Sequence, residues 1–314
     1  MSSKIKIKKS DERELGFGTV ASATKQRSLN KDGTANIQRN GIAHLNALNI
    51  YHDLIRMKWS KFIFLVLTGY FIMNVVFATT YFLVGIQNLT GMQHSTAVRD
   101  YWECFFFSTQ ALTTVGFGRV APISFAANVV TSIESMVGLL TFALATGLLY
   151  GKFSRPTAKI FYSQHALVAP YKDITGFMFR VANARNNQLI EAEATLIIAF
   201  DVEENGKRIR KFQTAALELQ KISFLALSWT IVHPIDDNSP LKNLTHDDFT
   251  NSDIEFLFML KAVDDTYAQT VYSRSSYKAP EIIFNAKFKT IIGTAPDGRP
   301  SLDLHRIDDY EMVG

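Results

Sequence analysis

One run of the sequence limits the possible folds more than any other, because between Phe62 and Val98 there is no Asp, Glu, Lys or Arg. Residues 62–86, FIFLVLTGYFIMNVVFATTYFLVGI, exceed the about 20 apolar residues that cross a bilayer as a helix. A second run, from Pro122 to Gly151, has Glu134 as its only residue of these four types. The sequence therefore predicts two transmembrane helices, at about 61–86 and about 123–151.

Charged residues outside the two spans indicate how the chain is oriented. Basic residues precede the first span and follow the second, namely Arg56, Lys58, Lys61, Lys152, Arg155 and Lys159. The positive-inside rule then puts both termini in the cytoplasm. The first run is too long for the apolar core of a signal peptide and begins far from the N-terminus. We expect a multi-pass protein of the plasma membrane, which in a bacterium is the inner membrane.

The remaining sequence divides by composition. Residues 1–45 are polar without a sustained period, which predicts an extended or mobile cytoplasmic arm, and the GFG at Gly16–Gly18 lies within it. Residues 46–60 carry apolar side chains at helical spacing, as in a short amphipathic helix lying in the membrane interface. Residues 61–152 hold the two spans. Residues 153–314 are short β-rich runs between turn-rich stretches, which predicts a cytoplasmic all-β sandwich.

The helical segment between the two spans is too short to cross the membrane, but its apolar composition is typical of a segment that lies within the membrane. DYWECFFFSTQAL, starting at Asp100, is compatible with a half-length helix and is followed by TTVGFG. Glycine-rich backbone at membrane depth is tolerated only where it is buried in protein or lines a water-filled path. An ion pathway explains this arrangement.

A row of backbone carbonyls is what an ion filter needs. Gly116 and Gly118 permit unusual backbone dihedral angles, Thr114 adds a hydroxyl oxygen, and Val115 and Phe117 can pack outward. One chain supplies only one such row, so a ring of carbonyls requires several copies. We expect a homotetramer with a helix and filter at about 101–118.

TTVGFG between two spans resembles the potassium-channel signature, and further segments resemble one family of those channels. YHDLIRMKW is similar to the slide helix of inward-rectifier potassium channels, GLLYGKFSRPTAKIFYSQHALVAPY to their inner-helix exit, and TIVHPIDDNSPL to a cytoplasmic-domain signature. The similarity covers about residues 40–290 and is closest to the prokaryotic members. It implies a tetramer with two transmembrane helices and a pore helix per subunit, an immunoglobulin-like cytoplasmic sandwich, passive potassium conduction and regulation by anionic lipids.

The resemblance also assigns residues to the ion path. It places potassium ions at Thr114, Val115, Gly116 and Phe117, with Gly118 completing the filter. It makes Phe142, Thr146 and Tyr150 pore-lining, with the two aromatic residues as hydrophobic constrictions, and Gly138 a hinge whose simpler role is close helix packing. Phe142 stands where strong rectifiers have an acidic residue, so strong block by Mg²⁺ or polyamines at that position is in doubt.

Three polar residues are expected near the filter. Glu134 is an intramembrane carboxylate, which we expect behind the filter and bonded to the pore helix. Gln110 occupies the position where mammalian relatives have a glutamate paired with an arginine. Arg119 directly follows the filter and is either a solvated residue of the outer mouth or a charge that makes the mouth less attractive to cations.

Basic residues near the inner membrane surface are candidate ligands for anionic lipids or phosphoinositides: Arg56, Lys58, Lys152, Arg155 and Lys159. Each Lys or Arg near the surface contributes about 1 kcal/mol of attraction. Simple anchoring by the positive-inside rule would place the same residues there. The family resemblance favours regulation by lipid.

Other functional classes find no support in the sequence. No arrangement of nucleophile, base and acid, and no phosphate-binding loop, stands at useful spacing, so we expect neither an enzyme nor a cofactor, and no nucleic-acid partner. Cys104 is the single cysteine and reads as a packed thiol, while His165 and His233 read as structural. Two alternatives stay open: a two-span potassium channel gated by a ligand of the cytoplasmic domain, and a non-conducting, membrane-anchored β-sandwich used for interaction.

Overall fold

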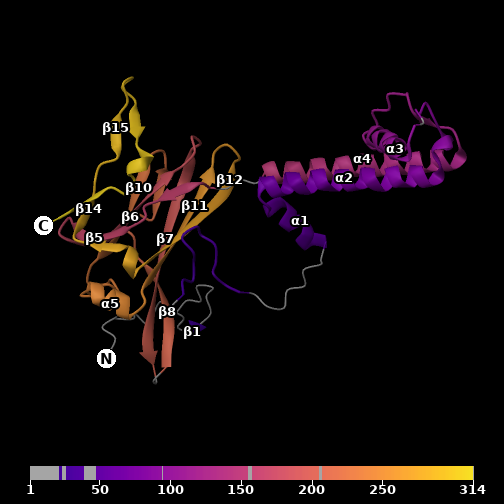
Figure 1. Ribbon diagram of the computed structural model, residues 1–314. Helices are drawn as coiled ribbons and strands as arrows, with labels where there is room; N and C mark the ends of the chain where they lie inside the picture. Colours follow the sequence, from indigo (N-terminus) through magenta and orange to yellow (C-terminus); the bar gives the residue numbers. More distant parts are fainter. Residues whose placement is uncertain are drawn as a thin grey trace. The chain divides into compact units, whose positions relative to one another are not determined.

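The computed structural model describes residues 21–22, 26–38, 47–93, 95–154, 158–204 and 207–313. The chain forms two compact units (Figure 1). Residues 41–155 make a helical unit, while residues 1–40 and 156–314 together make a β-rich unit. Each unit is described by itself.

Two long helices dominate the helical unit. These are α2 (Trp59–Val84) and α4 (Phe125–Phe153), with 26 and 29 residues, and both are long and apolar enough to cross a membrane. The amphipathic α1 (Ala47–Arg56) precedes α2, and α3 (Ala97–Leu112) lies between the two long helices. The prediction of two membrane-spanning helices is confirmed by these elements.

Short elements link the C-terminal end of α2 to α3, and α3 to the N-terminal end of α4. After α2 come η2 (Ile86–Asn88) and β2 (Leu89–Thr90), and β2 pairs antiparallel with β3 (Ala121–Pro122) just before α4. The side-chain hydroxyl of Thr96 caps α3 by accepting from the amide of Arg99, and Ser124 caps α4 in the same way by accepting from the amide of Ala127. These caps fix where both helices begin.

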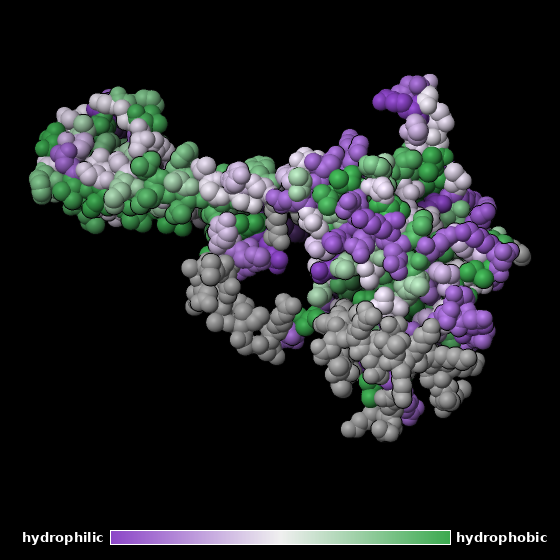
Figure 2. Space-filling view, turned by 180° about the vertical axis from the view of Figure 1, so that it is seen from behind, coloured by the Kyte–Doolittle hydropathy of each residue, from purple (hydrophilic) through white to green (hydrophobic). Residues whose placement is uncertain are grey.

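The surface of the helical unit is apolar along most of its length (Figure 2). Phe64, Leu83 and Leu144 are between 70% and 79% exposed. A continuous surface of large apolar side chains, exposed in the single chain, marks a region that lipid or another protein covers. The buried core of this unit is small and lies where α2, α3 and α4 meet, around Tyr81 and Phe107.

Two mostly antiparallel sheets form the main part of the β-rich unit. The first runs in the order β1 (Ala21–Ser22), β8 (Lys207–Ala215), β7 (Leu189–Glu204), β11 (Glu255–Asp264), β12 (Gln269–Lys278), with β9 (Lys221–Phe224) also paired to β7. The second runs β10 (Ser228–Ile235), β6 (Ile174–Asn183), β5 (Ala166–Tyr171), β13 (Ile282–Phe284), with β4 (Ile160–Tyr162) also paired to β6. Among the strands of the described residues, only β13 and β5 pair in parallel.

The two sheets face each other across one shared core. Phe177 and Phe179 of β6 pack against Phe256 and Phe258 of β11, with ring centroids 3.9 Å and 4.8 Å apart in the two facing pairs. Alternation of apolar residues along both strands delivers these rings to the same layer. The predicted β-rich domain is confirmed, and its two sheets form a sandwich.

Smaller elements complete the β-rich unit. The capping box of Thr245 and Asp248 starts α5 (His246–Asn251), and η3 (Ala279–Glu281) precedes β13. The remaining elements are β14 (Ala286–Phe288), β15 (Ile292–Thr294), β16 (Pro300–Leu302), η4 (Leu304–Arg306) and β17 (Tyr310–Met312). Phe288 of β14 packs against Leu167 and Met178 on the face of the second sheet that points away from the sandwich core.

Part of the N-terminal region belongs to the β-rich unit. The amides of Ser28 and Leu29 donate to the buried carboxylate of Glu255 at 3.0 Å and 3.2 Å. Gly33 (φ 82°) makes a tight turn against the backbone of Arg274, where a Cβ would come within 2.6 Å of the carbonyl oxygen. The expectation of an extended or mobile arm over residues 1–45 is therefore wrong for residues 26–38. Gly16–Gly18 lies outside the described residues.

Candidate functional site

The loop that follows α3 has an unusual backbone. Thr114, Gly116 and Gly118 have φ values of 58°, 51° and 79°, whereas Val115 and Phe117, between them, have negative φ. An ordinary strand turns successive carbonyls to opposite sides, and alternation in the sign of φ lets them face the same side. Neither glycine would place a Cβ near another atom, so glycine is required here by conformation and not by space.

Hydrogen bonds tie the amides of this loop to α3 and leave its carbonyls available. The amide of Thr114 donates to the carbonyl of Ala111 at 3.1 Å, and that of Val115 donates to the carbonyl of Gln110 at 3.0 Å. Within the described parts of the chain, no backbone amide donates to the carbonyls of residues 114–117. Gln110 thus anchors the loop through its main chain, and the free carbonyl oxygens are what a dehydrated cation needs.

The end of α3 lies at the middle of α4. A Cβ on Gly138 would come within 1.9 Å of the carbonyl oxygen of Leu112, so the two helices touch backbone to backbone. Gly138 is close to the midpoint of α4, which runs from Phe125 to Phe153. The loop 114–118 therefore begins halfway along the length of a helix that can span the membrane.

Behind α3, a buried hydrogen-bond network joins the three helices. Glu134 of α4 is fully buried and accepts from the hydroxyl of Ser108 of α3 at 2.5 Å and from that of Tyr81 of α2 at 2.6 Å. Ser108 also lies 3.2 Å from the side-chain oxygen of Asn74. The carboxylate thus bonds to the back of α3 through Ser108 and to α2 through Tyr81.

Arg119 has a partner that sequence reasoning missed. Its guanidinium forms an ion pair with Glu103 of α3, whose side chain is only 13% exposed. Glu103 lies two helical turns before Gln110, on the same face of α3. The side chain of Arg119 is still 49% exposed, so its interpretation as a solvated residue of the outer mouth or as a charge that repels cations stays a prediction, and the ion pair with Glu103 adds a contact that the sequence did not indicate.

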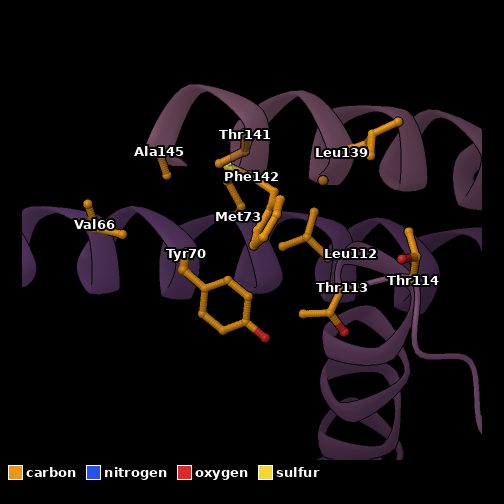
Figure 3. Close-up of a pocket in the computed structure, with 11 residues that line it drawn as sticks. Val66, Tyr70, Met73, Leu112, Thr113, Thr114, Leu139, Thr141, Phe142 and Ala145 are labelled. Carbon is orange, nitrogen blue, oxygen red and sulfur yellow. Dashed lines mark hydrogen bonds between the residues drawn. The ribbon is translucent and has the colours of Figure 1, made fainter. Parts of the chain in front are cut away.

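The inner half of α4 presents the residues predicted to line the pore. Phe142 and Tyr150 are 72% and 74% exposed in the single chain, and Thr146 is exposed between them. Phe142 also lines a cavity of about 510 Å³ between α2 and α4, together with Tyr70 and Met73 of α2 and Leu112 of α3 (Figure 3). The structure thus leaves these α4 side chains uncovered by the rest of their own chain.

The predicted lipid-binding residues separate into two groups. Arg56, Lys58 and Lys159 are exposed, and Arg155 lies outside the described residues. Lys152 instead points back into the protein, where its ammonium donates to the carbonyl of Ile55 at 3.0 Å and to that of Met57. Lys152 thus has protein partners that the sequence did not indicate, and its role as a lipid ligand stays a prediction.

His233 and His165 have structural surroundings. The Nδ1 of His233 donates to the carbonyl of Ala216 at 2.6 Å, and its Nε2 accepts from the hydroxyl of Ser239 at 2.8 Å. Burial lowers the pKa of His233, which keeps the ring neutral. His165 packs edge-on against Tyr310. No group of three or more metal-ligating side chains occurs among the described residues.

Comparison with known proteins identifies the family. The inward rectifier potassium channel transmembrane domain matches residues 29–156, and the C-terminal domain of the same channels matches residues 160–314. The chain belongs to the inward rectifier potassium channel family. The resemblance inferred from TTVGFG and its neighbours is thereby confirmed.

Members of the family from distant organisms are similar over most of this chain. Inward rectifier potassium channel Kirbac3.1 of Paramagnetospirillum magnetotacticum is 34% identical over 93% of this chain and 98% of its own length. ATP-sensitive inward rectifier potassium channel 8 of Rattus norvegicus is 26% identical over 92% of this chain and 74% of its own length. Inward rectifier potassium channel irk-1 of Caenorhabditis elegans is 22% identical, covering 85% and 53%.

Membership of this family excludes several of the other functional classes. Inward rectifier channels are membrane-embedded potassium channels, which are not enzymes and which need no cofactor, and potassium is the ion that permeates. The predictions of a potassium channel and of a protein that is not an enzyme are confirmed on that basis.

Proposed function

We propose that four copies of this chain form a potassium channel in which residues 114–118 line the narrowest part of the path. The observation that carries this proposal is the alternation of positive and negative φ from Thr114 to Gly118, with carbonyls that no amide of the described chain occupies. Four such rows around an axis would replace the hydration shell of K⁺ with carbonyl oxygens, mainly of Thr114, Val115, Gly116 and Phe117. Conduction would be passive, down the electrochemical gradient of K⁺, and it requires binding at these sites that is weak enough for the ion to leave.

The position of α3 supports the same reading. Its C-terminal end abuts Gly138 near the middle of α4, so the negative end of the helix dipole lies at mid-membrane depth. Half-helices that end there stabilise a cation in the adjoining water-filled cavity. Each of the four copies would contribute one such helix end.

The inner path is proposed to run along α4. Phe142, Thr146 and Tyr150 succeed one another at steps of four residues, which keeps them near one face of the helix. Rings of Phe142 and Tyr150 would close the path by excluding water, and Gly138 would serve as the hinge. Because Phe142 carries no charge, we expect weak block by Mg²⁺ or polyamines there.

The β-rich unit is proposed to extend the path into the cytoplasm. Its two-sheet sandwich is compatible with an immunoglobulin-like fold, and the basic residues beside both spans support cytoplasmic termini. The channel would reside in the plasma membrane, which is the inner membrane of a bacterium. Arg56, Lys58, Arg155 and Lys159 would bind anionic lipids, with phosphoinositides as the regulatory class.

Ion flux into liposomes tests the proposal. The purified full-length protein is reconstituted in neutral lipid, with and without phosphoinositide, and uptake of radioactive rubidium is measured in competition with K⁺ or Na⁺. We expect K⁺, but not Na⁺, to compete with rubidium uptake. Phosphoinositide should change the rate of uptake, and Gly116→Ser should abolish it. Absence of uptake in every lipid, with a correctly assembled tetramer, would favour a non-conducting membrane-anchored protein. Uptake that does not change with phosphoinositide would contradict only the proposed regulation by lipid and would leave the proposed potassium pore in place.

A further inference from the structure

The two halves of the loop 114–118 are held differently by their own chain. The amides of residues 114–116 all donate to carbonyls of α3, which ties the first half of the loop to that helix. In the described part of the chain, no backbone amide of residues 117–119 donates to a backbone carbonyl. Residues 113–119 are exposed in the single chain, and burial resumes only at Val120. The second half of the loop therefore depends on what holds the chain directly after it.

A pair of short strands holds that part of the chain. The strand β2 pairs antiparallel with β3. One further backbone hydrogen bond lengthens the pairing, from the amide of Ile123 to the carbonyl of Asn88 at 2.9 Å. We call residues 88–91 and 119–123 the β2–β3 clamp. The clamp begins directly where the loop ends.

Side chains from both segments of the clamp are fastened to the core of the helical unit. Leu89 and Val120 are 4% and 6% exposed and belong to the same buried cluster as Phe107 of α3. Arg119 adds the ion pair with Glu103 of α3. The clamp thus joins the end of the loop both to α3 and to the segment that follows α2.

Gly91 permits a close backbone contact inside the clamp. Its φ is 78°, in the left-handed region, and a Cβ built on it would overlap the carbonyl oxygen of Arg119. The same Cβ would lie 3.5 Å from the Cα of Val120. Glycine is therefore required at this position both by conformation and by space, and a larger residue would have to push the two backbones apart.

We propose that Gly91 is a positioning residue for the ion filter, because it lets the β2–β3 clamp close on the backbone of Arg119 and so fixes the second half of the loop 114–118. This inference deepens the proposed function and rests on it. A binding site has to be held within about 0.5 Å of its productive geometry by the residues that support it. Hydrogen bonds to α3 give this support to the first half of the loop, and the clamp gives it to the second half.

The test measures the K⁺ concentration at which the assembled channel becomes more stable. The purified full-length protein is heated in detergent over a series of K⁺ concentrations, with Na⁺ keeping the ionic strength constant. The temperature at which the oligomer dissociates is recorded. An ion that binds the folded state raises this temperature once its concentration exceeds the dissociation constant, so the onset of the rise reports the affinity of the filter. A merely structural weakening lowers the temperature at every K⁺ concentration and leaves the onset unchanged.

Gly91→Ala is expected to raise the onset concentration of K⁺ about tenfold, because the added methyl group forces the clamp and the end of the loop apart. Gly85→Ala is the matched control, since Gly85 also has a positive φ, 104°. A Cβ at Gly85 meets only the flexible end of the Gln87 side chain. The onset in this control should equal that of the unsubstituted protein.

Leu89→Ala weakens the clamp without adding volume, and it decides the question if Gly91→Ala does not assemble. The substitution removes a buried side chain from the cluster that holds Val120. The onset concentration of K⁺ should therefore rise in this variant too.

A disulfide allows the weakened clamp to be closed again. Thr90 and Ala121 lie opposite each other in the antiparallel pair, where Cα atoms about 4.5–5.5 Å apart suit a disulfide. Thr90→Cys and Ala121→Cys are added to Leu89→Ala, and the native Cys104 is fully buried and does not interfere. Oxidation should return the onset to the value of the unsubstituted protein, and reduction should raise it again.

The outcomes separate failure of this inference from failure of the proposed function. An unchanged onset in Gly91→Ala, or in Leu89→Ala where only that variant assembles, overturns the inference. An onset that stays raised after the disulfide has formed overturns it as well. If K⁺ does not stabilise even the unsubstituted assembly, the proposed potassium pore itself fails, and the role of Gly91 fails with it.

Discussion

At the scale of single residues, the roles proposed for charged groups near the loop 114–118 depend on the partners of those groups. Arg119 carries a charge that alone would repel cations from the mouth, but Glu103 neutralises it at close range. Glu134 is a carboxylate inside the membrane unit, yet two hydroxyl donors accommodate it. Residue type and position along the chain predicted that these groups matter, and the partners determine how.

Glu103→Gln is expected to lower potassium conductance at low salt. The substitution leaves the guanidinium of Arg119 without its partner, and copies of this charge around the mouth reduce the local cation concentration. Single-channel recording at low and high KCl checks the effect, which should fade at high salt because the Debye length falls to about 3 Å at 1 M. Arg119→Gln should shift low-salt conductance the opposite way. Equal conductance in both variants at low salt would contradict a role for the pair.

Glu134→Ala is expected to destabilise the assembled channel, whereas Glu134→Gln is not. Alanine leaves the hydroxyls of Ser108 and Tyr81 without their buried acceptor, at about 1–3 kcal/mol for each unsatisfied group. Glutamine keeps an acceptor for Ser108, and Tyr81 can still donate to Thr131. For each variant, two quantities are measured: the temperature at which the oligomer dissociates in detergent, and the selectivity for potassium over sodium. Identical losses in the two variants would show that the negative charge itself is required.

At the scale of elements, the approach of α3 to α4 sets where along α4 the loop 114–118 begins. The carbonyl of Leu112 occupies the space that any side chain at position 138 would need. The predicted hinge role of Gly138 remains a proposal, while its packing role follows from this contact. A glycine that permits close approach and a glycine that permits bending look alike in a sequence.

Two glycines of α4 allow the packing role to be tested. Gly138→Ala places a methyl group within 1.9 Å of the Leu112 carbonyl, so α3 or α4 must shift and flux should fall at least about tenfold. Gly147→Ala meets nothing within 4 Å in the same helix and gains the same helix propensity. Rubidium uptake by equal amounts of assembled protein compares them. Similar flux in the two variants would show that the α3–α4 contact does not limit conduction.

The strand β10 carries a pH-dependent contribution to stability through His233. Because burial lowers the pKa of this ring, the unfolded state takes up its proton first as the pH falls. The contribution is therefore fully present above the ordinary pKa of about 6.5 and declines below it, by at most about 1.4 kcal/mol per pH unit. Amide hydrogen exchange of β10 between pH 5 and pH 8 measures the slope, and His233→Gln should remove it. An unchanged slope in that variant would assign the effect to other groups.

The sequence predicted elements with a strong physical signature and missed contacts between distant segments. The uncharged run after Phe62 predicts a helix because a membrane core leaves few alternatives, and the residues from Thr114 to Gly118 predict an ion path because glycine-rich backbone has few uses there. The docking of residues 26–38 was missed because it depends on Glu255, which is more than two hundred residues away. The same reason hid the carbonyl partners of Lys152.

At the scale of the whole molecule, the chain joins a membrane unit to a β-rich unit. The sequence that precedes α2 contributes to both units. Residues 26–38 pack on the β sandwich through Glu255 and Glu281, and α1 follows a few residues later in the helical unit. Much of the surface of α2 and α4 is apolar and uncovered in the single chain (Figure 2). Lipid and further copies of the chain are the two environments that would cover it.

The reversal potential under bi-ionic conditions tests the central claim most directly. The reconstituted channel is recorded in a planar bilayer with potassium on one side and sodium on the other. If four rows of carbonyls from residues 114–118 select the ion, the reversal potential lies far toward the value set by potassium alone, and Gly116→Ser abolishes that selective current. A reversal potential near zero in the unsubstituted protein would show that this backbone row does not form a potassium filter, and would contradict the account.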